Sequence, residues 1–174
     1  EIRYWYEKGY KTIKVSDDNL TLSKDRVMKL CDLIIKNNIK INIESPNGIR
    51  ADRADRDMLA KMKEAGWSIL AFGVESANND ILKIIKKGET IEQIEKAVKD
   101  AIELGFDVAL FFMVGNPGET AEHVERSIEF ALKYPVRNAN FYNVIPFPGT
   151  ELYEYVNKNN LWIQDPETYL NEMA

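Results

Sequence analysis

Five short runs of apolar residues recur along the chain at intervals of about 30 residues, and each is followed by a cluster of polar residues or glycines. An amphipathic helical pattern follows every cluster. A strand-length apolar run that alternates with a helix predicts a repeated βα unit, and therefore parallel strands. The runs cover 12–15, 39–43, 69–74, 108–114 and 140–145, and the clusters cover 16–19, 44–48, 75–76, 115–119 and 146–150.

Capping residues and glycines mark the ends of the predicted helices. Ser23 is the expected N-cap of the second helix, and Thr90 with Gln93 forms a capping box at the start of another. Gly9 and Gly105 are placed to end helices in the left-handed conformation. The first predicted helix ends at Gly9, and the last begins near 150. The predicted helices between them cover 24–37, 55–66, 79–86, 90–105 and 120–133.

The repeated unit is compatible with a doubly wound sheet or with part of a barrel. A complete eightfold barrel takes about 250 residues, so five units in 174 residues predict an incomplete one. We expect a single domain over residues 1–174, with residues 161–174 as a C-terminal tail. Ligands of both architectures bind beyond the carboxyl ends of the strands, so we expect the functional residues there.

Composition narrows the class of protein. The single cysteine, Cys31, lies in the apolar stripe of a helix and is expected to be a core residue. A lone cysteine fits a reducing, cytoplasmic location. There is no apolar run of about 20 residues and no visible secretory signal, so no membrane segment is expected. The net charge of −5, with scattered Lys and Arg, gives no evident nucleic-acid surface.

Carboxylates follow four of the five predicted strands. For Asp17, Asp18, Glu44 and Glu119, ordinary helix capping and a functional role both remain open. Glu75 directly follows six strand residues, so its side chain should enter the mouth of the sheet, where an acid is costly without a partner. The segments 115–120 and 146–150 are either tight turns or walls of a cleft, and His123 is expected to be a capping or solvated residue.

Seven segments, taken in order, resemble the radical S-adenosylmethionine (radical SAM) superfamily, in the methylthiotransferase-like branch that often carries a cobalamin-binding domain upstream. They are 13–21, 48–52, 59–66, 72–76, 86–88, 113–120 and 146–153, and they include the sequences Gly73-Val74-Glu75-Ser76 and Lys86-Lys87-Gly88. The resemblance implies a partial (βα)6 barrel of parallel strands.

The resemblance also implies the roles of several residues toward S-adenosylmethionine. The backbone near Asp17 and Asp18 is expected to receive the methionyl amino group, and Glu75 with Ser76 the ribose or that amino group. Lys87 is expected to meet the methionyl carboxylate, and Val114 and Gly115 the adenine. Residues expected at the substrate are Arg50, Glu44 and Pro146.

The family holds a [4Fe–4S] cluster on three cysteines, whereas this chain has one. The resemblance therefore implies that the first strand and the cysteine-rich loop are absent, and that the chain is an inactive fragment with no catalytic residue or metal ligand of its own. The parent protein would contain the cluster, and cobalamin in another domain, and would generate a 5′-deoxyadenosyl radical that abstracts hydrogen from an unidentified substrate.

Two other interpretations remain open. Asp18, Glu44 and Glu75 follow three successive predicted strands and could hold Mg²⁺ in a barrel lyase or hydrolase. Alternatively, the chain is a degenerate, non-catalytic binding module. The truncation that the resemblance implies would leave a sheet edge and apolar barrel-facing side chains uncovered, so we expect self-association through that edge.

Overall fold

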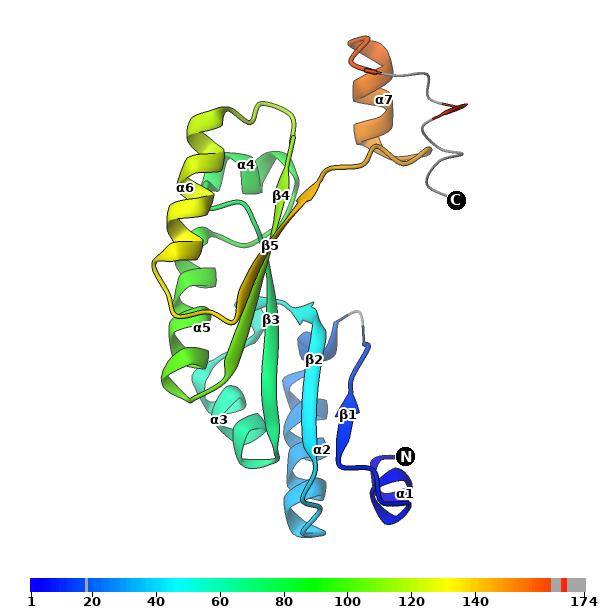
Figure 1. Ribbon diagram of the computed structural model, residues 1–174, viewed down its shortest axis with the longest axis vertical. Coiled ribbons are helices and arrows are strands. Elements are labelled where there is room, and N and C mark those ends of the chain that lie inside the picture. The colour runs from blue at the N-terminus through cyan, green and yellow to red at the C-terminus, as the bar shows by residue number, and fades with distance from the viewer. Residues whose placement is uncertain (18, 164–166, 169–174) are drawn as a thin grey trace. The chain divides into compact units, whose positions relative to one another are not determined.

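A five-stranded sheet forms the centre of the protein (Figure 1). The computed structural model describes residues 1–17, 19–163 and 167–168. The strands lie side by side in chain order, and the ladders that join β1 to β2, β2 to β3 and β3 to β4 are parallel. Sequential order without a reversal is that of a barrel and not of a doubly wound sheet. This confirms the predicted partial (βα) barrel. The strands are β1 (Thr12–Lys14), β2 (Asn42–Ile49), β3 (Trp67–Glu75), β4 (Asp107–Val114) and β5 (Asn138–Asn143).

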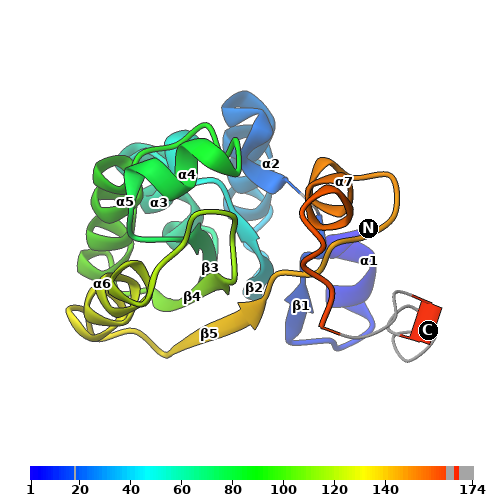
Figure 2. The ribbon, with the colours of Figure 1, turned by 90° about the horizontal axis from the view of Figure 1, so that it is seen from above.

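Helices connect the strands, and α3, α5 and α6 lie along one face of the sheet (Figures 1 and 2). The predicted caps are confirmed: Ser23 accepts the N–H of Arg26 at 3.3 Å, and Thr90 and Gln93 form a complete capping box. The helices are α1 (Ile2–Glu7), α2 (Lys24–Lys36), α3 (Arg56–Glu64), α4 (Asn79–Ile84), α5 (Ile91–Glu103) and α6 (Ala121–Leu132), with 3₁₀ turns at Leu20–Leu22 and Ala51–Arg53.

The hydrophobic core lies between that face of the sheet and the helices. Alternate residues of β3 and β4 are buried in it, because successive strand side chains point to opposite faces. Cys31 is fully buried in the same core, as predicted. The core side chains include Val27, Ile43, Met58, Met62, Leu70, Phe72, Val74, Ile94, Val98, Leu110 and Phe112.

β2 differs from the sequence prediction. The strand runs over Asn42–Ile49, through the polar cluster that we expected to be a loop, while Ile39 and Ile41 precede it. A register shift against β3 between Ser45 and Ile49 accommodates Pro46 and Gly48. Proline and glycine are tolerated in sheets at such irregularities. Consequently, Glu44 lies within β2 and not behind its end.

Two compact units make up the chain, Glu1–Tyr142 and Asn143–Ala174. The second unit contains α7 (Glu151–Lys158), whose N-cap Thr150 accepts the N–H of Tyr153 at 3.2 Å. The rings of Tyr153 and Trp162 meet edge to face 5.6 Å apart. A single domain over residues 1–174 stays a prediction.

Candidate functional site

The backbone turns sharply at Glu75, where β3 ends. Glu75 has a φ of +62°, and the N–H of Ser76 donates to the carbonyl of Val74 at 2.8 Å, which closes a γ-turn around Glu75. The register against β4 also shifts between Gly73 and Glu75. A non-glycine residue in this region costs about 1–3 kcal/mol, and such strain concentrates at functional sites. The strained turn therefore indicates that the direction of the Glu75 side chain is important for function.

The turn places the Glu75 carboxylate over Gly73. A Cβ atom on Gly73 would lie 2.6 Å from Glu75 Oε1 and 3.1 Å from Lys87 Nζ, so only glycine leaves this space free. Gly73 pairs with Phe111 in the β3–β4 ladder, and the next residue, Phe112, is buried against Phe130 of α6. The carboxylate and the ammonium thus lie on the face of the sheet opposite those helices.

Lys87 is held between two acids. Its Nζ lies 3.1 Å from Glu75 Oε1 and 3.4 Å from Glu89 Oε2. The side chains of Lys87 and Glu75 are 17% and 20% exposed, whereas that of Glu89 is 0% exposed. Glu75 and Lys87 therefore form one site, as the sequence prediction requires.

Arg50 and Asp52 extend this cluster. The Arg50 guanidinium donates to both oxygens of Asp52, at 2.9 and 3.1 Å, and to the carbonyl of Lys87 at 3.3 Å. This pairing lowers the pKa of the Asp52 carboxyl against the opposing effect of burial. The N–H of Asp52 donates to Glu89 Oε1 at 2.9 Å. Arg53 Nε also lies 3.6 Å from Asp52 Oδ2, so three carboxylates and three cations meet in the cluster.

Glu89 and Asp52 were missed by sequence reasoning. Both stand in short polar turns, in which acids are usually solvated. The sequence contains only a weak indication that Glu89 belongs to the site: it stands between Lys87-Gly88 and the capping residue Thr90.

Ser76 and the end of β4 have structural partners. Ser76 is fully buried, and its hydroxyl accepts the side-chain N–H of Asn78 at 3.1 Å. At the end of β4, Glu119 accepts the N–H groups of Gly115, at 2.7 Å, and Asn116, at 3.2 Å, so it stabilises this loop. The cofactor contacts expected of Ser76, Val114 and Gly115 stay predictions.

The remaining predicted residues have other partners, belong to the second unit or fall outside the described residues. Asp17 pairs with Arg26 at 3.2 Å, and Asp18 lies outside the described residues. Glu44 lies 4.0 Å from Lys14 Nζ and accepts the side-chain N–H of Asn42 at 3.2 Å. Pro146 belongs to the second unit. Within the described ranges, no three His, Cys, Asp or Glu residues gather into a metal-binding group.

His123 has a structural role, as expected. Its Nδ1 accepts the N–H of Thr120 at 3.1 Å and completes the capping box of α6, while its Nε2 lies 3.1 Å from Asp80. These contacts fix the start of α6 beside α4.

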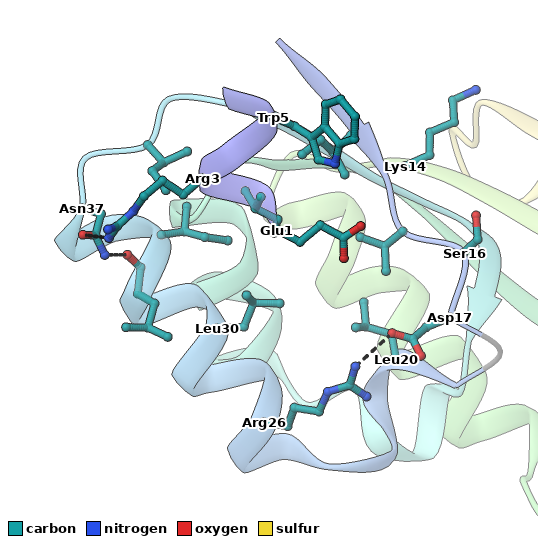
Figure 3. Close-up of a pocket in the computed structure, with 16 residues that line it drawn as sticks. Glu1, Arg3, Trp5, Lys14, Ser16, Asp17, Leu20, Arg26, Leu30 and Asn37 are labelled. Carbon is teal, nitrogen blue, oxygen red and sulfur yellow. Dashed lines mark hydrogen bonds and ion pairs between the residues drawn. The ribbon is translucent and has the colours of Figure 1, made fainter. Parts of the chain in front are cut away.

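A cavity of about 680 Å³ lies at the β1 edge of the sheet, between α1 and α2. Figure 3 shows the Asp17–Arg26 pair on its wall, and Arg3 joined to Asn37. Apolar side chains form most of the remaining wall: Ile2, Trp5, Ile13, Val15, Leu20, Leu30, Leu33, Ile34 and Ile39. Glu75 and Lys87 do not line this cavity.

The family model described as "Radical SAM superfamily" matches residues 1–131. The chain belongs to the radical SAM superfamily. Within the described residues of this radical SAM chain, no helix has the length and apolar character needed to cross a membrane.

Relatives and solved structures agree with this family. An uncharacterized methyltransferase of Pyrococcus horikoshii is 38% identical over 90% of this chain and 34% of its own length. The heme chaperone HemW of Bacillus subtilis is 30% identical over 94% of this chain and 45% of its own length. The chain thus spans less than half the length of these curated relatives.

The fold is that of solved radical SAM enzymes. The radical S-adenosylmethionine methyltransferase TsrM from Kitasatospora setae, with cobalamin and a [4Fe–4S] cluster bound, matches with a TM-score of 0.82 at 18% identity, over 95% of this chain and 34% of that one. Coproporphyrinogen III oxidase HemN from Escherichia coli matches with a TM-score of 0.69 at 18% identity, over 84% and 36%. At these identities the likeness shows the fold alone.

Proposed function

We propose that this chain is the S-adenosylmethionine-binding part of a larger radical SAM enzyme, and that the Glu75–Lys87 pair binds the amino acid portion of that cofactor. The observation that carries the proposal is the 3.1 Å contact between a carboxylate and an ammonium, both partly exposed, over a glycine that leaves space for them. An amino acid zwitterion presents the complementary pair of charges.

The charges of the site support this assignment. S-adenosylmethionine carries a sulfonium, an ammonium and a carboxylate, so its net charge at neutral pH is positive, and two carboxylates, those of Glu75 and Glu89, lie beside the single ammonium of Lys87. Glu75 accepts a hydrogen bond from the methionyl ammonium or from a ribose hydroxyl, and Lys87 donates a hydrogen bond to the methionyl carboxylate. The adenine contact expected of Val114 and Gly115, and the backbone contacts expected near Asp17 and Asp18, stay predictions within this proposal. When bound, S-adenosylmethionine supplies the reactive carbon, and the residues of this chain bind and orient it.

The residues of this chain do not fit the iron–sulfur cluster. Such clusters are held by thiolates. The single cysteine, Cys31, is fully buried in α2, and burial raises the pKa of its thiol to about 11. We therefore propose that the cluster ligands belong to a part of the protein outside this sequence, and that the chain alone is inactive. Three further expectations stay predictions: a cobalamin bound in a further domain, a cytoplasmic location, and a substrate that contacts Arg50, Glu44 and Pro146.

Removal of the Lys87 charge tests the proposal. S-adenosylmethionine and 5′-methylthioadenosine, which lacks the amino acid portion, are titrated into the isotope-labelled chain and followed by NMR. Lys87→Met should weaken S-adenosylmethionine binding about tenfold or more, because a charge-assisted hydrogen bond is lost, and should leave methylthioadenosine binding unchanged.

Lys83→Met, an exposed lysine of α4, is the matched control and should bind as the wild type does. A wild-type chain that binds neither compound, or a Lys87→Met variant with unchanged affinity for both, overturns the proposal.

A further inference from the structure

Glu89 is the most deeply buried charged group of the cluster. Its side chain is 0% exposed, and Oε2 makes no hydrogen bond among the described residues, although it lies 3.4 Å from Lys87 Nζ. A carboxylate oxygen out of contact with water and without a hydrogen bond is costly unless a cation stands beside it. The structure places that cation at Lys87.

The other oxygen anchors Glu89. Oε1 accepts the N–H of Asp52 at 2.9 Å, and the Asp52 carboxylate in turn accepts from Nε and Nη2 of Arg50. Glu89 also immediately precedes Thr90, the N-cap of α5, so its backbone is fixed by a helix start. The carboxylate therefore has little freedom to leave Lys87.

The two acids around Lys87 differ in their access to solvent. Glu75 is 20% exposed and ends a strand at the open face of the sheet, whereas Glu89 is closed off. The Lys87 ammonium donates a hydrogen bond to Glu75 Oε1 at 3.1 Å, whereas Glu89 Oε2 is an ion-pair neighbour at 3.4 Å without a hydrogen bond. A ligand can take Glu75 from Lys87, but it cannot reach Glu89.

We infer that Glu89 is a positioning residue that keeps Lys87 paired and in place while Glu75 turns to the ammonium of the bound amino acid. This inference rests on the proposed function. It adds a role for Glu89, whereas the proposed function itself involves only Glu75 and Lys87. Without Glu89, a ligand that draws Glu75 away would leave Lys87 with no carboxylate of the described residues beside it to hold its position.

Glu89→Gln tests this role, because it keeps the shape and the acceptor for Asp52 N–H but removes the charge. We expect about a tenfold loss of S-adenosylmethionine affinity in the NMR titration, because the ion pair that holds Lys87 is lost, with methylthioadenosine affinity unchanged. Glu89→Asp retains the charge and should recover part of the loss. Glu125→Gln, an exposed acid on α6, is the matched control.

The outcomes separate the two proposals. If the wild type binds S-adenosylmethionine and Glu89→Gln binds both compounds as well as the wild type, the positioning role is wrong while the proposed function stands. If Glu89→Gln weakens both compounds equally, Glu89 only supports the fold, and the inference is overturned. If Glu89→Gln does not fold, the ratio of the two affinities in Glu89→Asp decides, because an unchanged ratio contradicts the inference.

Discussion

The carboxylate of Glu75 occupies the space in which Gly73 lacks a side chain. A Cβ atom at Gly73 would lie 2.6 Å from Glu75 Oε1, closer than non-bonded atoms approach. The relationship depends on the γ-turn at Glu75, which directs its side chain back along β3. The position of the acid is therefore fixed both by its own backbone and by the residue two places before it.

Gly73→Ala should disturb the site more than the fold. The backbone of Gly73 is outside the left-handed region, so alanine is tolerated there, and the atoms it would meet are at the ends of two flexible side chains. We expect a loss of about 1 kcal/mol in the free energy of unfolding, measured by chemical denaturation, and a clear loss of S-adenosylmethionine binding.

A double-mutant cycle provides the control for Gly73. In a Glu75→Ala background, the carboxylate that Gly73→Ala displaces is gone, so the second substitution should change binding little. Equal effects of Gly73→Ala in both backgrounds would show that the space over Gly73 does not position Glu75.

The strands and helices could largely be predicted from the sequence, because they follow from local signals. Apolar runs located β3 and β4, and side-chain caps located α2, α5 and α6. β2 was predicted over 39–43, ahead of its observed range of Asn42–Ile49, because Pro46 and Gly48 are turn residues in most contexts. Only pairing with β3 across a register shift keeps this segment in the sheet. Tertiary pairing of this kind leaves no local signal.

The site could be predicted only in part. The meeting of Glu75 and Lys87 followed from the family resemblance and not from their spacing. The burial of Glu89 could not be predicted, because it arises where the turn after α4, the start of α5 and the Ala51–Arg53 turn converge. A single acid in a polar turn gives no sign of such convergence.

Glu95 joins α5 to the end of α6 and should make stability depend on pH. It accepts from Lys133 Nζ at 2.6 Å and from the hydroxyl of Tyr134, and these bonds lower its pKa from 4.5 to about 2. Because the folded pKa lies below the unfolded one, the stabilisation is complete above about pH 5 and is lost as the pH falls from 4.5 toward 2.

Glu95→Gln should therefore lower the free energy of unfolding at pH 7 by about 1–3 kcal/mol, and the difference from the wild type should shrink by pH 3. Urea denaturation at both pH values measures this. Glu122→Gln removes an exposed pair with Arg126 and should cost no more than about 0.5 kcal/mol. A Glu95→Gln variant whose deficit is the same at pH 3 as at pH 7 would contradict the assignment.

The β1 edge of the sheet should support self-association. β1 has three residues and a single neighbouring strand, so its outer backbone groups face away from the sheet, and unpaired edges of this kind tend to pair with other chains. Beside it lies the 680 Å³ cavity with its mainly apolar wall, which includes Leu33 at 57% exposure.

We expect the mass of the wild-type chain to rise with concentration in sedimentation velocity. Leu33→Glu should shift the chain toward the monomer, because association would bury a charge. Leu132→Glu changes an 80% exposed leucine of α6 away from this edge and should sediment as the wild type does. A wild-type chain that stays monomeric at high concentration would show that this edge does not join two copies.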